Sequence, residues 1–132
     1  MQDNELIGLA LGARNNSYSP YSGFKVGAAL LCSSGKVYTG CNAENAAYPA
    51  CICAERAVAA AAVSAGEREF SAIAVVGGKE EISDFCPPCG ECRQVLGEFA
   101  GEGFKILLFN GKEIKILTMD EILPFGFGSD KL

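Results

Sequence analysis

Histidine is absent from this 132-residue sequence. Ser-His and Cys-His nucleophilic systems both need an imidazole, so neither can operate here. If the protein is an enzyme, proton transfer near neutral pH has to come from a carboxylate whose pKa is shifted from its ordinary value.

Long apolar runs and an excess of basic residues are also lacking. The longest apolar stretch, 57–63, is far too short to cross a bilayer. A net charge of -5 argues against a surface that follows nucleic-acid phosphates and suits a small, uncharged ligand. The chain starts with acidic residues, where a secretory leader would be basic. We therefore expect a cytoplasmic protein with neither a membrane nor a nucleic-acid partner.

Length and composition favour one domain spanning residues 1–132, because 49% of the residues are hydrophobic and can form a core. Periodicity and turn residues predict four helices: one capped by Asp3 and ended at 15–17, then Ala54–Ala65, Cys89–Ala100 and a short Met119–Leu123. They also predict five strands: Val26–Cys32, Val37–Cys41, Ala72–Val76, Lys105–Phe109 and Lys112–Leu117. The last two strands are expected to be joined by a type I′ turn at Asn110-Gly111. This order predicts a three-layer α/β/α sandwich with a mixed five-stranded sheet.

The seven cysteines indicate metal or redox chemistry more than a disulfide framework, since we expect a reducing compartment. Cys32 and Cys41 lie in predicted strands and fit the role of small core residues. Cys86 and Cys89 could form a redox pair, and Cys51 or Cys86 could be the fourth ligand of a structural zinc site. The reading we favour leaves Cys51 and Cys86 as free thiols near a functional site.

Two short segments together match the pattern of the zinc deaminases. In Cys53-Ala54-Glu55-Arg56 a cysteine stands two residues before a glutamate, and Pro88-Cys89-Gly90-Glu91-Cys92 follows downstream. Three thiolates, Cys53, Cys89 and Cys92, would hold one zinc ion per chain and leave a fourth position open for water. The N-terminal ends of two helices would favour the deprotonated sulfurs. Glu55, in the first turn of an apolar helix, is the candidate for proton transfer.

Arg56 is the only basic residue in these two segments. Three thiolates leave the zinc site with a net negative charge, which weakens the ion as a Lewis acid. We expect Arg56 to offset this charge by donating hydrogen bonds to ligand sulfurs. The alternative is an ordinary solvated helix residue.

With these segments in place, the chain resembles the small, homotetrameric cytidine deaminases from its first helix almost to its C-terminus. Residues 21–30 (YSGFKVGAAL) resemble the family's P-Y-S-x-F-x-V-G-A-A-L segment, and residues 40–46 (GCNAENA) its G-x-N-x-E-N-A segment. Residues 88–94 (PCGECRQ) continue the second metal motif, and Leu123-Pro124 precedes the family's aromatic tail.

The resemblance implies roles for further residues. Phe24 would pack on the pyrimidine, Asn42 and Glu44 would hydrogen-bond the ribose hydroxyls, and the Ala54 backbone and Glu55 would read the edge of the base. Tyr48 would lie at a subunit boundary, and Phe127, or equally Phe125, would reach the site of a neighbouring subunit.

The resemblance therefore implies a homotetrameric enzyme with shared active sites that deaminates cytidine and deoxycytidine in pyrimidine salvage. Two alternatives stay open at this point. One is a deaminase of another aminopyrimidine, such as a nucleoside antibiotic or a free base. The other is a non-catalytic, zinc-stabilised binding module.

Overall fold

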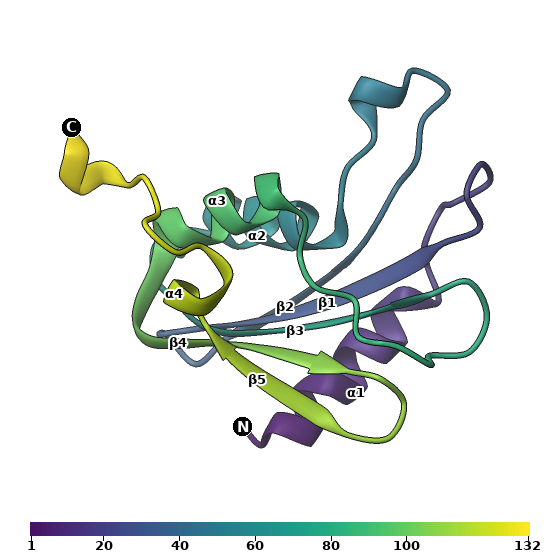
Figure 1. Ribbon diagram of the computed structural model, residues 1–132, viewed down its shortest axis with the longest axis horizontal. Helices are drawn as coiled ribbons and strands as arrows, with labels where there is room; N and C mark the ends of the chain where they lie inside the picture. Colours follow the sequence, from purple (N-terminus) through teal and green to yellow (C-terminus); the bar gives the residue numbers. More distant parts are fainter.

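A single twisted sheet organises the protein, which is described over residues 1–132 by a computed structural model (Figure 1). The elements in chain order are α1 (Asp3–Arg14), β1 (Lys25–Cys32), β2 (Val37–Cys41), α2 (Ala54–Ser64), β3 (Phe70–Gly78), α3 (Gly90–Phe99), β4 (Ala100–Phe109), β5 (Ile114–Thr118) and α4 (Met119–Ile122), with short 3₁₀ turns at Tyr48–Ala50 and Ser129–Lys131. The strand order is β2-β1-β3-β4-β5. Only β3 and β4 are parallel, so the predicted mixed five-stranded sheet is confirmed.

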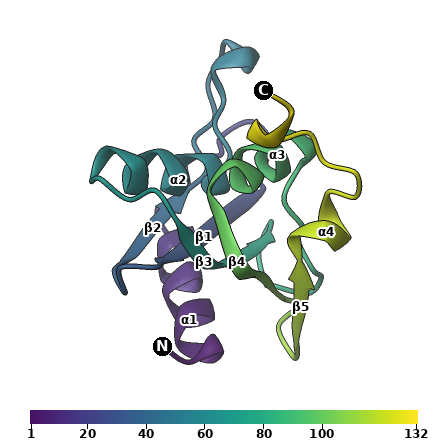
Figure 2. The same cartoon turned by 90° about the vertical axis from the view of Figure 1, so that its left-hand side faces the viewer.

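Helices cover both faces of this sheet, with α1 on one side and α2 and α3 on the other (Figure 2). Successive side chains of a strand point to opposite faces. Thus Ala28 and Leu30 of β1 join the core beneath α2 and α3, whereas Ala29 joins the core beneath α1. The expected three layers are present.

Small residues let both flanking helices approach β1 and β2 closely. A β-carbon on Gly27 would collide with the carbonyl oxygen of Ala10 and the backbone nitrogen of Arg14 in α1. A β-carbon on Gly40 would lie 3.2 Å from the Cβ of Val58 in α2. The alanine-rich α2 buries one side, including Ala54, Val58 and Ala62, against the sheet, whereas Ala60 and Ala61 are exposed on its other side.

Several details of the prediction are wrong. The first helix is capped by Gln2 rather than Asp3, which is its first helical residue. The helices containing the metal motifs end a residue earlier than expected, at Ser64 and Phe99. The β4–β5 connection is not a type I′ turn, because that turn needs positive φ at both central residues and Gly111 alone has one. Instead, the Asn110 side chain accepts hydrogen bonds from two backbone amides, of Lys112 and Glu113.

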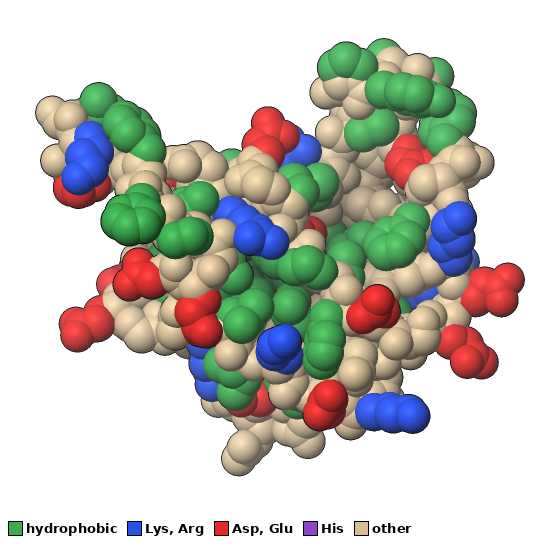
Figure 3. All heavy atoms as spheres, in the orientation of Figure 1, with side chains coloured by type: hydrophobic (Ala, Val, Ile, Leu, Met, Phe, Trp, Pro, Cys, Tyr) green, Lys and Arg blue, Asp and Glu red, His purple; other side chains and the backbone are tan.

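Two segments project from the body of the molecule. The first is an arm, residues 43–51, which leaves β2 and returns to α2; the second is the C-terminal tail, residues 124–132 (Figure 1). Both present hydrophobic side chains to solvent on either side of a hollow (Figure 3). Tyr48 on the arm is 71% exposed, and Phe127 on the tail is 60% exposed. No helix in the structure combines the length and the apolar character that crossing a bilayer requires.

Candidate active site

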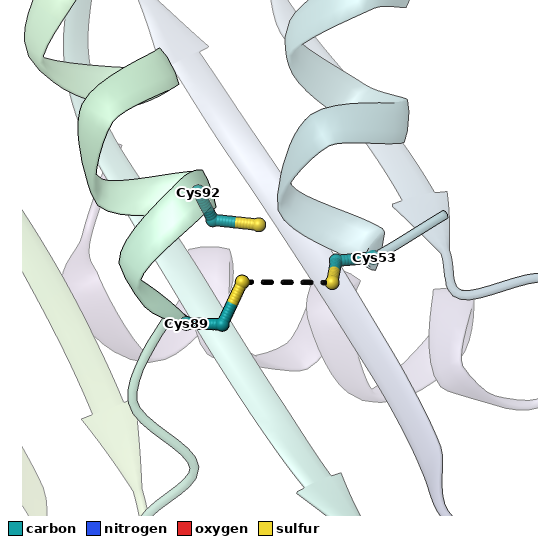
Figure 4. Close-up of side chains that lie close together, drawn as sticks. All are labelled: Cys53, Cys89 and Cys92. Atoms are coloured by element: carbon teal, nitrogen blue, oxygen red, sulfur yellow. Dashed lines mark hydrogen bonds between the residues drawn. The ribbon is translucent and has the colours of Figure 1, made fainter. Parts of the chain in front are cut away.

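Cys53, Cys89 and Cys92 converge between the N-terminal ends of α2 and α3 (Figure 4). Cys53 is the N-cap of α2, Cys89 is the N-cap of α3, and Cys92 lies in the first turn of α3. Their three Sγ atoms all lie within 4.8 Å of one another, and those of Cys53 and Cys89 are 3.8 Å apart. The two predicted segments, 36 residues apart in sequence, therefore form one cluster.

The geometry of this cluster fits a zinc ion. Sulfurs bound tetrahedrally at about 2.3 Å from zinc are about 3.8 Å apart, the separation found for Cys53 and Cys89. Hydrogen bonding to Cys92 lowers the pKa of the Cys53 thiol below its ordinary value, which favours the thiolate form of this sulfur. Neither Cys51 nor Cys86 belongs to the cluster, so the set leaves a fourth tetrahedral position free, as in catalytic zinc sites.

Glu55 is the only charged side chain that is buried, with 4% of its surface exposed. Burial raises its pKa to about 7, and the nearby Cys53 sulfur adds to the shift. A carboxyl group that titrates near neutral pH can both accept and donate a proton at that pH. Position and pKa together suit the proton-transfer role predicted for Glu55.

Arg56 reaches back to the cysteine cluster. Its Nη2 lies 3.6 Å from the Sγ of Cys53 and 3.3 Å from a carboxylate oxygen of Glu91. The contact with Cys53 raises the pKa of the guanidinium further above its ordinary value. This contact places a guanidinium N–H against the Cys53 sulfur, the arrangement expected if Arg56 offsets the charge of the sulfurs. Nε of Arg56 is buried and has no hydrogen-bond partner, so one donor of the guanidinium is left unpaired.

A cavity of about 500 Å³ opens beside the cluster. It is large enough for a nucleoside-sized ligand, at the lower end of the range for small-molecule sites. Its lining includes eight of the site residues predicted from the sequence: Asn42, Glu44, Tyr48, Cys53, Ala54, Glu55, Arg56 and Cys89. Cys51 and Cys86 also line it and are free thiols, as expected.

Asn42, at the end of β2, is held by bonds within the chain. Its Oδ1 accepts from the backbone N–H of Val26 at 2.9 Å and from the Ser17 hydroxyl, while its Nδ2 donates to the carbonyl of Phe24 at 2.9 Å. An amide has two acceptor sites on oxygen and two N–H groups. One N–H of Asn42 is therefore left for a ligand.

Glu44 is held in a similar way. Its Oε1 accepts from the backbone N–H groups of Tyr21 at 2.9 Å and Ser22 at 3.1 Å, and its Oε2 accepts from the Ser22 hydroxyl. A carboxylate offers about four acceptor positions, so one on Oε2 is left. These hydrogen bonds, first that from the Ser22 hydroxyl, lower the pKa of Glu44. Its carboxylate is therefore ionised at neutral pH.

The predicted aromatic contacts divide into near and distant ones. The Phe24 ring lies beside Gly77 and Cys86, but Phe24 is not among the residues that line the cavity. Tyr48 lines the cavity from the arm and makes an edge-to-face contact with Tyr21, with ring centroids 6.1 Å apart. Phe127 is outside the cavity of its own chain; its carbonyl accepts a bond from Gln94 at 2.8 Å.

The sequence interpretation missed three residues of this region. Ser17 and Ser22 orient Asn42 and Glu44 through their hydroxyls, and Glu91 forms an ion pair with Arg56 at the mouth of the cavity. The two serines lie 25 and 22 residues from their partners, and serines in a turn-rich loop are common for local reasons. Glu91 lies between two predicted ligands in the sequence, so its place near the site could be predicted, but its ion pair with Arg56 could not.

Comparison with known proteins agrees with the geometry. The family model described as the cytidine and deoxycytidylate deaminase zinc-binding region matches residues 1–107. The chain is 44% identical to cytidine deaminase from Sporosarcina psychrophila and 42% identical to that from Halalkalibacterium halodurans; each match covers 100% of this chain and at least 96% of the relative.

Solved structures of cytidine deaminases are also similar to this chain. The crystal structure of cytidine deaminase from Burkholderia pseudomallei superposes with a TM-score of 0.86 at 43% identity, covering 96% of this chain and 100% of the other. That from Mycobacterium tuberculosis gives 0.81 at 40% identity, covering 97% and 98%. The cluster of three cysteines is consistent with one zinc ion per chain in this zinc-binding region. From its sequence, its fold and its zinc-binding region, the chain belongs to the cytidine and deoxycytidylate deaminase family.

Proposed function

We propose that this protein catalyses the zinc-dependent hydrolytic deamination of cytidine and deoxycytidine to uridine and deoxyuridine, releasing ammonia, in the cytoplasm. The observation that carries the proposal is a buried carboxyl, Glu55, beside three cysteine sulfurs that leave one zinc position open, at the wall of a nucleoside-sized cavity. Relatives at 41–44% identity are named cytidine deaminases, which supports the same substrate class. Seven free cysteines suit a reducing compartment.

Glu55 carries the proton transfers in the proposed mechanism. When bound, zinc lowers the pKa of water toward about 7 and supplies it as a nucleophile. Glu55 accepts a proton from the attacking water and delivers it to N3 of the ring, while the water oxygen forms a bond to C4. Glu55 then moves the second proton of that water to the amino group, the C4–N bond breaks, and ammonia departs. The Ala54 backbone and Glu55 orient the base, and Arg56 partly neutralises the sulfurs.

The free positions on Asn42 and Glu44 support acceptance of both nucleosides. One N–H of Asn42 and one acceptor position of Glu44 are left for a ligand. A single hydroxyl can accept from one and donate to the other. Cytidine and deoxycytidine share the 3′-hydroxyl, so a site with these two free positions does not need the 2′-hydroxyl that distinguishes them.

A substrate panel tests the proposed function. Turnover of cytidine, deoxycytidine, cytosine and dCMP is measured by the loss of cytosine-ring absorbance. We expect cytidine and deoxycytidine to be converted, and cytosine to show a kcat/KM ~100-fold lower, because it forfeits one hydrogen bond to the charged Glu44, worth roughly 1.5–3 kcal/mol, and one to the neutral Asn42, worth roughly 0.5–1.5 kcal/mol. Robust conversion of cytosine without conversion of cytidine contradicts the proposal. Bound zinc with no turnover at all indicates the non-catalytic module instead.

We also propose a homotetramer whose active sites are shared between subunits. The tail supports this: Phe125 is fully exposed with φ of 54°, and Phe127 is 60% exposed, so neither ring contributes to the core of its own chain. Tyr48 on the arm, at the cavity edge, is exposed too. Exposed aromatics of this kind provide much of the binding energy at interfaces.

Removing the tail tests this assembly. Truncation after Pro124 is expected to raise KM for cytidine by ~10-fold or more, since central interface aromatics contribute about 2 kcal/mol or more, while zinc content stays unchanged. The matched control is truncation after Ser129, which keeps both phenylalanines. Sedimentation of the full-length chain as an active monomer at assay concentration excludes shared sites.

A further inference from the structure

The segment Ser19–Phe24 is folded around the carboxylate of Glu44. Two backbone N–H groups, from Tyr21 and Ser22, donate to Oε1, and the Ser22 hydroxyl donates to Oε2. The turn is closed by a bond from the N–H of Gly23 to the carbonyl of Ser19 at 2.9 Å. Gly23 has φ of 71°, a conformation that favours glycine. The Glu44 carboxylate, rather than water, therefore accepts the hydrogen bonds that these two backbone N–H groups donate.

The Ser22 hydroxyl has a second partner. While its hydrogen goes to Oε2 of Glu44, its oxygen accepts from the backbone N–H of Phe24 at 2.9 Å. One side chain therefore joins the carboxylate of Glu44, which lines the cavity, to the backbone of Phe24. Ser22 itself does not line the main cavity, so it acts through these two residues.

We propose that Ser22 is a positioning residue for sugar recognition: its hydroxyl fixes the Glu44 carboxylate so that the remaining acceptor position on Oε2 faces the sugar hydroxyl of the substrate. A glutamate side chain has three rotatable bonds and loses considerable rotamer freedom when it is ordered. With Oε1 held by two backbone groups, only the Ser22 hydroxyl contacts Oε2, the oxygen that retains a free position. The lowered pKa of Glu44, caused chiefly by that hydroxyl, agrees with a stable contact.

The proposal rests on the proposed function, and its test compares two substrates in two proteins. Deoxycytidine carries the 3′-hydroxyl and 2′,3′-dideoxycytidine lacks it. In the wild-type protein kcat/KM is expected to be much higher for deoxycytidine. In Ser22→Ala this ratio is expected to shrink about tenfold, the effect of weakening one hydrogen bond to a charged group. The shrinkage should come mainly from KM for deoxycytidine, because Ser22 does not touch the reacting atoms.

Two variants serve as controls. Ser22→Thr keeps a hydroxyl and is expected to retain most of the wild-type ratio. Ser19→Ala removes a hydroxyl from the same turn whose contact is with Ser17 at 3.3 Å, and is expected to leave the ratio unchanged. Circular dichroism and melting temperature show whether each variant is folded.

Three outcomes overturn the proposal, and they are distinguishable. If Ser22→Ala lowers kcat/KM for both substrates by the same factor, the ratio is unchanged and the serine is only a structural part of the turn. If the wild-type protein converts neither substrate, the proposed function fails and the role of Ser22 falls with it. A ratio that falls equally in Ser22→Ala and Ser22→Thr also contradicts a role for the hydroxyl.

Discussion

Replacing Glu55 by glutamine is expected to lower kcat for cytidine by ~100- to 10,000-fold, the range that general acid–base catalysis contributes. Glutamine has nearly the size of glutamate, so the packing around this buried position is retained. It cannot accept a proton from water or pass one to N3 and to the departing amine. Zinc content is expected to stay at the wild-type level, because Glu55 is not one of the clustered sulfur ligands. Steady-state kinetics and metal analysis of the same preparation measure both quantities.

A glutamate outside the site provides the matched control. Glu98 lies on α3 and is exposed, so Glu98→Gln makes the same chemical change without touching the cavity, and it is expected to leave kcat within about twofold, as surface changes of this kind usually do. A Glu55→Gln protein that keeps both its zinc and most of its turnover contradicts the proposed mechanism. A variant that loses zinc as well shows instead that Glu55 supports the metal cluster.

The order and type of the elements could be predicted because their local signals agree with the final fold. The apolar run of β1 predicts a strand and the alanine-rich α2 predicts a helix, and the structure contains both. The ends of the elements are harder to predict where strand pairing overrides the local propensity of the residues. The strand β4 starts at Ala100, five residues before its predicted start, although it passes through Gly101 and Gly103. Its first residue pairs with Phe70 of β3, and no local pattern encodes that partner.

The candidate site divides in the same way. The cysteine and glutamate positions follow from motif spacing, since a C-x-x-C at a helix start brings two sulfurs together and the second helix supplies the third. Ser17 and Ser22 could not be identified, because their partners are 22 or more residues away and are reached only when β2 ends beside the 18–24 loop. The substrate contacts and the assembly stay predictions, since they depend on a ligand and on further chains, and the single-domain boundary also stays a prediction.

Replacing Cys92 by alanine is expected to remove zinc and activity together. Cys92 is fully buried, and its sulfur is one of the three that lie close enough together to hold one metal ion. Losing an outer contact of a metal site typically costs 10–100-fold in affinity, so losing one of three ligands is expected to lower zinc affinity by more than ~100-fold. Competition with a chromophoric chelator measures this affinity directly, and thermal unfolding checks that the variant is still folded.

The matched controls are Cys51→Ala and Cys86→Ala. Both thiols line the cavity but lie outside the cluster of three sulfurs, so each variant is expected to keep wild-type zinc affinity. These controls also decide between the two zinc sites considered from the sequence. Tight zinc binding in Cys92→Ala together with loss of zinc in Cys86→Ala or Cys51→Ala contradicts the three-sulfur site. This result would favour a different set of zinc ligands. If four protein sulfurs bound the zinc, no coordination position would remain for the water that deamination requires.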